Sequence, residues 1–245
     1  GNETHRLVRD VVEAEPVDPL HLKGKAEPVA AWRLLGVLDV PGAIPRSLGS
    51  PMVGRRRQLA QLRQGFDAVV EDRTCQLVTV FGSAGVGKSR LVEEFLSGLD
   101  GGATVLTGRC LPYGDGITYY PVVESVKQAA GLADFDPPEV VESKVCAVLA
   151  TDEHQELVCR RVSQLMGIAD AGAGEETFWA IRRFYEAVAR ERPLVLVFDD
   201  VQWGEPTFLD LLDHIADWSG GSPILLVCMA RPDLLEARPA WGGGK

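Results

Sequence analysis

A glycine-rich segment, Gly82 to Ser89, constrains the fold of this chain more than any other feature of its 245 residues. It reads Gly82-Ser83-Ala84-Gly85-Val86-Gly87-Lys88-Ser89 and fits the pattern G-x-x-x-x-G-K-[ST]. Glycines let the backbone curl so that successive N–H groups face inward, and the positive end of a following helix faces the same anion. An apolar run, Gln76 to Phe81, precedes the segment and an amphipathic run, Lys88 to Leu99, follows it. This context predicts a phosphate-binding loop, with a plain glycine-rich turn as the alternative.

The last two residues of the loop carry the chemistry expected of a nucleotide site. All the loop residues are candidate ligands of ATP or ADP, and Lys88 is expected to reach the outer phosphates as a binding and catalytic group. The hydroxyl of Ser89 is expected to bind Mg²⁺, which also takes oxygens from the nucleotide. The loop therefore predicts a nucleotide site whose metal arrives with its ligand.

A second candidate site segment follows an unbroken apolar run, Leu194 to Phe198, which is typical of a strand buried on both faces. The run ends in Asp199 and Asp200, and an unpaired buried carboxylate is costly. A magnesium ion beside the phosphates explains the pair. We expect Asp199 to hold a magnesium-bound water and Asp200 to act on the attacking water as its base or orienting group. The alternative is that the two acids cap a helix or form a turn.

The order of the remaining elements predicts the fold class. Strand-like runs at 76–81, 103–109, 194–198 and 224–229 alternate with helical patterns at 55–71, 88–99 and from Pro206 to near Gly220. Residues 120–190 are mostly helical and form an insertion before the acid-bearing strand. The chain is therefore expected to be an α/β protein, a P-loop NTPase parallel sheet with helices on both faces and a helical insertion.

The amino-terminal part has a different pattern. Residues 1–37 show a helical opening over Leu7 to Val12 and two strand-like pieces, Leu20 to Leu22 and Val29 to Val37. The stretch from Gly36 to Gly54 has the proline and glycine content of a linker. We expect a small unit at 1–37, a linker at 38–50 and an ATPase core at 51–245. Because the chain begins with glycine and ends in a loop-like segment, we expect a fragment at both ends.

Charge and hydropathy exclude some partners. Lys and Arg total 25 against 35 Asp and Glu, a formal charge of −10, which argues against direct nucleic-acid or acidic-membrane binding. No apolar run approaches the roughly 20 residues that span a bilayer. The expected location is cytoplasmic.

Cysteines, histidines, tryptophans and one arginine cluster are further candidates for a functional role. The five cysteines form no Cys-x-x-Cys pair and are expected to be buried thiols, not disulfides or zinc ligands, and the four histidines show no metal spacing. Trp203 and Trp218 are expected in the core. The cluster Arg55-Arg56-Arg57 is expected to be a solvated helix start, with a phosphate or nucleic-acid role as the alternative.

The loop and acids, taken with Val53-Gly54-Arg55, Gly108-Arg109-Cys110 and the segment Phe198 to Trp203, resemble the signal-transduction ATPases with numerous domains. These are relatives of the AAA+ class that occur in large bacterial regulators and fused to class III nucleotide cyclases. The resemblance covers residues 51–245. It implies that Val53 and Gly54 lie near the adenine and that Arg231 occupies the first sensor position, where it would contact the outer phosphate. For Arg231, a solvated arginine opening a loop is the alternative.

Residues 1–37 are similar to the extreme carboxyl end of a class III adenylate or guanylate cyclase, in particular at Thr4 to Asp10, Leu22-Lys23-Gly24-Lys25 and Glu27-Pro28-Val29. The metal-binding aspartates of a cyclase belong upstream of such a tail, so no cyclase activity is expected from this chain. The second acid, Asp200, stands where active AAA+ machines usually carry Glu. That difference, together with the expected truncation before a lid domain, implies slow hydrolysis.

Three functions compete on this basis. The first is an ATP-binding, slowly hydrolysing regulatory switch of a cyclase-linked signalling protein. The second is a P-loop phosphotransferase, and the third is a nucleotide-stabilised interaction platform of a transcriptional regulator. The partners expected for the first are nucleotide, the cyclase domain and further carboxyl-terminal domains of the parent chain, and a nucleotide-dependent oligomer.

Overall fold

The protein is described from a computed structural model that covers residues 5, 12–20, 29–37, 52–112, 118–166 and 174–242. The chain divides into two compact units, Gly1–Pro51 and Met52–Lys245. No helix among these residues is both long and apolar enough to cross a membrane.

The first unit contains an antiparallel pair of strands, β1 (Val12–Leu20) and β2 (Val29–Val37), paired from Val12 with Val37 to Leu20 with Val29. The prediction of a helix up to Val12 is wrong at that residue, because Val12 opens β1; Leu7 to Val11 lie outside the described residues. The strand expected at Leu20 to Leu22 coincides with β1 at Leu20, and His21 and Leu22 lie outside the described residues. Both strands of a two-stranded sheet are edges, which is why β1 accommodates Pro16 and Pro19.

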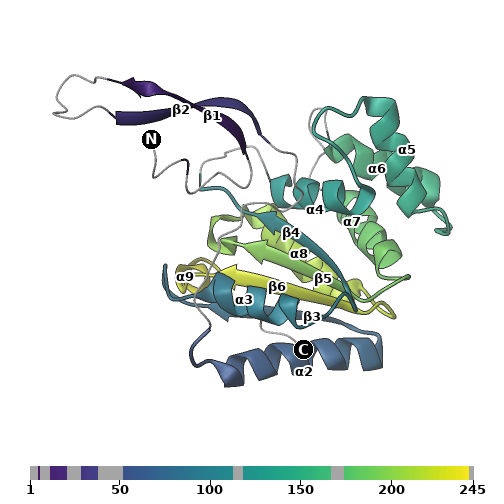
Figure 1. Cartoon of the computed structure of the whole chain (residues 1–245). Coiled ribbons are helices and arrows are strands. Elements are labelled where there is room, and N and C mark those ends of the chain that lie inside the picture. Colours follow the sequence, from purple (N-terminus) through teal and green to yellow (C-terminus); the bar gives the residue numbers. More distant parts are fainter. Residues whose placement is uncertain are drawn as a thin grey trace. The chain divides into compact units, whose positions relative to one another are not determined.

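The second unit is built on a parallel sheet with the strand order β3-β6-β5-β4 (Figure 1). Its strands are β3 (Cys75–Phe81), β4 (Thr104–Arg109), β5 (Leu194–Asp199) and β6 (Ile224–Ala230). The predicted α/β fold with a P-loop NTPase sheet is confirmed. Both central strands, β5 and β6, have almost every residue buried, as their continuous apolar runs predict.

Helices cover both faces of this sheet (Figure 1). On one face, α2 (Arg56–Asp72) and α3 (Lys88–Ser97) pack against Val195 and Val197 of β5. On the other face, the alternate residues of β5, Leu194 and Leu196, pack with α8 (Pro206–Trp218) and the inserted helices. Successive residues of a strand point to opposite faces, so a single apolar strand supplies both cores.

The described residues between β4 and β5 form an insertion of four helices: α4 (Tyr120–Ala130), α5 (Pro138–Val148), α6 (Gln155–Leu165) and α7 (Glu175–Val188). Cys146 and Cys159 are joined in a disulfide between α5 and α6, so the expectation that all cysteines are thiols is wrong for this pair. The packing of α5 against α6 brings the two Cα atoms to 5.1 Å, although 13 residues separate them in sequence. Cys110 and Cys228 are buried thiols, as expected.

The carboxyl-terminal end of the described chain returns to the sheet. After β6 come α9 (Asp233–Ala237) and Trp241, which is buried and donates a hydrogen bond from its indole Nε1 to the Thr79 hydroxyl at 2.9 Å. Trp203 and Trp218, which were expected in the core, are instead 45% and 67% exposed. Trp203 ends the short 3₁₀ turn η1 (Val201–Trp203) and Trp218 is the last residue of α8, so both lie at the ends of their elements.

Candidate nucleotide site

The phosphate-binding loop lies between the end of β3 and the start of α3. The N–H of Gly82 donates to the carbonyl of Ala230, at the end of β6, at 3.1 Å. Gly85 and Gly87 have φ values of 75° and 87°, a left-handed conformation that glycine adopts without steric cost. A Cβ on Gly82 would lie 2.6 Å from Val86 Cγ1. These three glycines therefore allow the tight curl that a phosphate cradle requires.

The ammonium group of Lys88 is turned back onto this loop. Its Nζ donates to the carbonyls of Gly82 at 2.8 Å and Ser83 at 3.3 Å. An ammonium has three donors, so one remains for an anion held by the loop. Lys88 is buried, whereas Ser83 to Val86 are exposed to solvent, and α3 presents its positive end at Lys88. The loop thus fits a phosphate group.

Arg55 was expected to be solvated, but it contacts the loop. Its Nη1 donates to the carbonyl of Gly87 at 3.0 Å and its Nη2 donates to the carbonyl of Val86. Gly54 and Arg55 both have positive φ values, 79° and 56°, immediately before α2. This double left-handed turn directs the chain into α2. Val53, the expected adenine neighbour, is 89% exposed, and Gly54 is also exposed.

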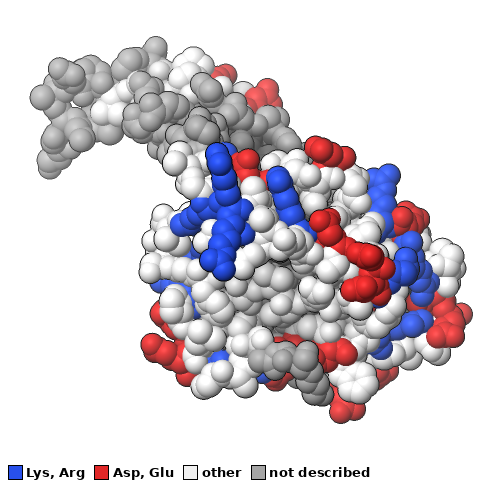
Figure 2. All heavy atoms as spheres, turned by 90° about the horizontal axis from the view of Figure 1, so that it is seen from below, with Lys and Arg blue, Asp and Glu red and all other residues white. Residues whose placement is uncertain are grey.

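The other two arginines of the cluster behave as expected. Arg56 and Arg57 are exposed at the start of α2. Figure 2 views the molecule from the side on which α2 lies. Basic side chains gather at the upper left of that face, and acidic side chains lie at its lower left and, mixed with basic ones, along its right side.

Asp199 and Asp200 lie where β5 ends. Asp199 Oδ1 accepts a hydrogen bond from the N–H of Asp200 at 2.8 Å. Asp200 has a left-handed backbone conformation, with a φ of 55°, where the chain passes from β5 into the 3₁₀ turn η1. Its carboxylate accepts hydrogen bonds from Arg109 Nη2 at 2.8 Å and from Gln202 Nε2 at 3.0 Å. The second acid is therefore engaged by a guanidinium and an amide.

These partners control the protonation of Asp200. Burial by itself raises the pKa of the carboxyl group. The hydrogen bonds from Arg109 and Gln202, with the positive charges of Arg109 and Arg231, outweigh burial and hold the pKa of Asp200 below its ordinary value. Asp200 is therefore a carboxylate, able to accept a proton or to orient water, throughout the neutral range.

Arg109 is a site residue that sequence reasoning did not assign to Asp200. It ends β4, is paired in register with Asp199, and donates its N–H to Glu124 Oε2 at 2.8 Å. The N–H of Cys110 donates to the carbonyl of Asp199 at 3.0 Å. The available signal was its place at the end of a strand, because parallel strands end at the same edge of the sheet.

Arg231, which follows β6, reaches the same network. Its N–H donates to Gln202 Oε1 at 3.0 Å, and its guanidinium carbon lies 5.7 Å from the ring centroid of Trp203. Gln202 thus contacts both Arg231 and Asp200. The structure brings the predicted sensor residue and the predicted second acid together through this glutamine.

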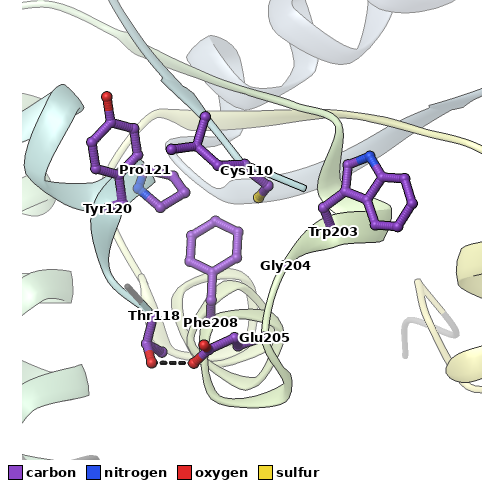
Figure 3. Close-up of a pocket in the computed structure, with 9 residues that line it drawn as sticks. Cys110, Thr118, Tyr120, Pro121, Trp203, Gly204, Glu205 and Phe208 are labelled. Atoms are coloured by element: carbon purple, nitrogen blue, oxygen red, sulfur yellow. Dashed lines mark hydrogen bonds between the residues drawn. The ribbon is translucent and has the colours of Figure 1, made fainter. Parts of the chain in front are cut away.

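A small cavity lies at the carboxyl ends of β4 and β5 (Figure 3). Phe208 projects into it, and Thr118 donates a hydrogen bond to Glu205 at its edge. Its volume is about 20 Å³, which is room for about one water molecule. The lining residues are Cys110, Leu111, Thr118, Tyr120, Pro121, Trp203, Gly204, Glu205 and Phe208. The cavity was not predicted from the sequence.

A parallel sheet with a curled glycine loop at the end of one strand and an acid pair at the end of another defines the P-loop NTPase class. The chain belongs to the AAA ATPase domain family, whose model matches residues 51–227. An uncharacterised protein of Rhizobium meliloti (strain 1021) is 32% identical to it over 226 residues. That match covers 86% of this chain and 22% of the relative, so the chain spans about a fifth of the relative's length.

Proposed function

We propose that this chain is an ATP-binding, slowly hydrolysing regulatory switch module of a multidomain signalling protein linked to a nucleotide cyclase. The observation that carries the proposal is the curled loop at Gly82 to Ser89. It leads into α3 and lies at the carboxyl ends of the parallel strands, where the acid pair also lies. Membership of the AAA ATPase domain family supports a nucleotide-binding regulatory ATPase.

The residues divide the work of binding and reaction. Loop N–H groups and Lys88 would hold the phosphates, and Ser89 with Asp199 would hold Mg²⁺. Mg²⁺, when bound, neutralises phosphate charge. Asp200 would accept the proton of the attacking water or orient it, and Arg231 would contact the outer phosphate. By family resemblance, Val53 and Gly54 would flank the adenine.

The Arg109–Asp200 ion pair supports slow hydrolysis. A carboxylate that accepts hydrogen bonds from Arg109 and Gln202 has fewer lone pairs for water, and its lowered pKa makes it a weaker base. Aspartate is also shorter than the glutamate of active relatives. The pair of acids at the end of β5, one for the metal and one for the water, favours hydrolysis over phosphotransfer.

The cyclase link rests on the resemblance of residues 1–37 to the end of a cyclase domain. The proposed partners are that cyclase domain, further carboxyl-terminal domains and a nucleotide-dependent oligomer, in a cytoplasmic setting without direct nucleic-acid or membrane binding. Because the tail lacks the metal-binding part of a cyclase, incubation with ATP or GTP and a divalent metal should yield no cyclic nucleotide. Product that survives repurification would contradict this assignment.

Titration calorimetry with ATP and ADP, in the presence and absence of Mg²⁺, tests the binding proposal. Lys88→Ala should weaken ATP binding by about 2 kcal/mol or more, because a phosphate charge loses its cation. Lys127→Ala, on α4, removes a lysine away from the loop and serves as the matched control. Equal ATP affinity in wild type and Lys88→Ala would overturn the proposal. Phosphate release from the wild type separates a hydrolysing switch from a platform that only binds nucleotide.

A further inference from the structure

An open recess lies among α6, α7 and α8, in the helical part of the second unit. Its volume is about 640 Å³, within the range of about 300 to 1,000 Å³ that is typical of small-molecule sites. The lining residues are Leu157, Glu175, Glu176, Trp179, Arg182, His214 and Trp218. The proposed nucleotide chemistry uses none of them.

Three aromatic rings form much of the recess wall. His214 and Trp218, one helical turn apart on α8, are stacked with centroids 6.2 Å apart and planes at 25°. Trp179 of α7 supplies the third ring and lies 5.4 Å from the ring of His154. Trp218 and Leu157 are both exposed, so this apolar lining is open to solvent. The faces of aromatic rings carry negative charge density and attract cations.

Most charged side chains that line the recess have ion-pair partners, but one carboxylate does not. Glu176 is paired with Arg161 of α6, and Arg182 is paired with Glu186 and donates to the carbonyl of Trp218 at 3.1 Å. Glu175 is exposed in the first turn of α7 and has no hydrogen-bond or ion-pair partner in the part of the chain that the structure describes. Among the residues that line the recess, Glu175 is therefore the carboxylate without an ion-pair partner, and Asp217 of α8 adds a further negative charge near His214.

His214 is a neutral ring in the recess and does not add a positive charge to that of Arg182. Burial, followed by the positive charge of Arg182, lowers the pKa of His214, and this outweighs the opposing effects of Asp217 and Glu175. The imidazole is thus uncharged at neutral pH and does not repel a cation in the recess.

We propose that this recess binds a small organic monocation whose alkylated ammonium group lies against Trp179, Trp218 and His214 and near Glu175. The aromatic wall favours an alkylated ammonium group, because such a group loses its hydration water more easily than a bare ammonium does. The unpaired carboxylate of Glu175 in the lining accounts for one positive charge. The volume of the recess accommodates a small molecule with an apolar body.

The probe for this site is benzyltrimethylammonium, with benzyl alcohol as its uncharged counterpart. Binding is followed by quenching of tryptophan fluorescence and by calorimetry. We expect saturable binding of the cation with a dissociation constant of about 1 mM or tighter, and at least about tenfold weaker binding of the alcohol. Comparable affinity for both compounds, or no saturable binding of the cation, would overturn the proposal.

Two variants and two matched controls locate the probe. Glu175→Gln and Trp218→Ala should each weaken binding about fivefold or more, since each removes one attraction for the cation. Both side chains are exposed, so their removal leaves the core intact. Glu139→Gln, in the first turn of α5, and Phe135→Ala, another exposed aromatic, should leave binding unchanged.

The variants also distinguish a small-molecule site from other outcomes. Unchanged affinity in both Glu175→Gln and Trp218→Ala would place the probe elsewhere and reject the recess. Binding of a lysine-rich peptide without binding of the small cation would assign the recess to a protein partner and would also contradict the proposal.

Discussion

Arg109 and Asp200, which are 91 residues apart in the sequence, form an ion pair across the ends of β4 and β5, with Nη2 and Oδ2 at 2.8 Å. Asp200 is the proposed water-directing acid, so under that proposal the ion pair would affect the rate of hydrolysis. The arginine side chain is about half exposed and therefore free to move away when another anion or a partner competes for it.

Replacement of Arg109 by Gln should raise the pKa of Asp200, because the principal cation opposing the effect of burial is lost. A group with a lowered pKa stays ionised down to a more acidic pH, so the acidic limb of the hydrolysis profile should move to higher pH in Arg109→Gln. The measurement is single-turnover phosphate release against pH. Arg160→Gln, an exposed arginine on α6, is the control. Identical acidic limbs in wild type, Arg109→Gln and Arg160→Gln would show that the Arg109–Asp200 ion pair does not lower the pKa of Asp200.

Asp199 and Asp200 should differ in what they support. Asp199→Asn should weaken Mg²⁺-dependent ATP binding, since a metal site loses charge. Asp200→Asn should leave affinity unchanged and lower turnover by about 10² to 10⁴, because a group that acts on water contributes in the transition state. ATP calorimetry and phosphate release on both variants test this division. Loss of affinity in Asp200→Asn equal to that in Asp199→Asn would reverse the two roles.

Gly108 should not tolerate a side chain. A Cβ there would lie 2.2 Å from the carbonyl oxygen of Pro121, a backbone atom that cannot rotate away. Gly108→Ala should therefore destabilise the second unit by about 1 to 3 kcal/mol, measured by urea unfolding. Gly220→Ala, whose added Cβ would meet no atom within 4 Å, should have little effect. Equal stability of the two variants would show that β4 and α4 can separate at no cost.

Asp152 should anchor the helical insertion. Its side chain is 0% exposed and is paired with Arg183 at 2.9 Å and Arg190 at 2.8 Å. Asp152→Asn should cost about 1 to 3 kcal/mol at neutral pH, because Arg190 loses its counter-charge and Arg183 keeps only Glu153 and Glu186. Asp67→Asn, an exposed acid on α2, is the control.

The effect of Asp152 should depend on pH. Although burial raises its pKa, the His154 N–H and the two arginines outweigh burial and lower it. The stabilisation is thus complete above the unfolded pKa of about 3.9 and is lost as the pH falls through the lower folded value. Urea unfolding of wild type and Asp152→Asn should give a gap that closes below about pH 4. A gap that is independent of pH would contradict the ion-pair explanation.

Local sequence patterns predicted most of the second unit. The spacing of glycines marked the loop at Gly82 to Ser89, and the apolar run before Asp199 marked β5, because both signals depend on neighbours along the chain. The predicted β3 and β4 differ from the observed strands by one residue at their starts. The first unit was predicted less well, since Pro16 and Pro19 obscured a strand that occupies an edge.

Tertiary structure alone decided which distant side chains meet. Strand order places Arg109 beside Asp200, and the turn before α2 places Arg55 on a loop 32 residues away. Helix packing joins Cys146 to Cys159 and lines the recess with Trp179 and Trp218. The amino-acid sequence by itself determined the loop, the acid pair and the α/β class, because those depend on periodicity and on the backbone freedom of glycine. The pairings depended on strand order and helix rotation, which are set by how whole elements bury their apolar faces against each other.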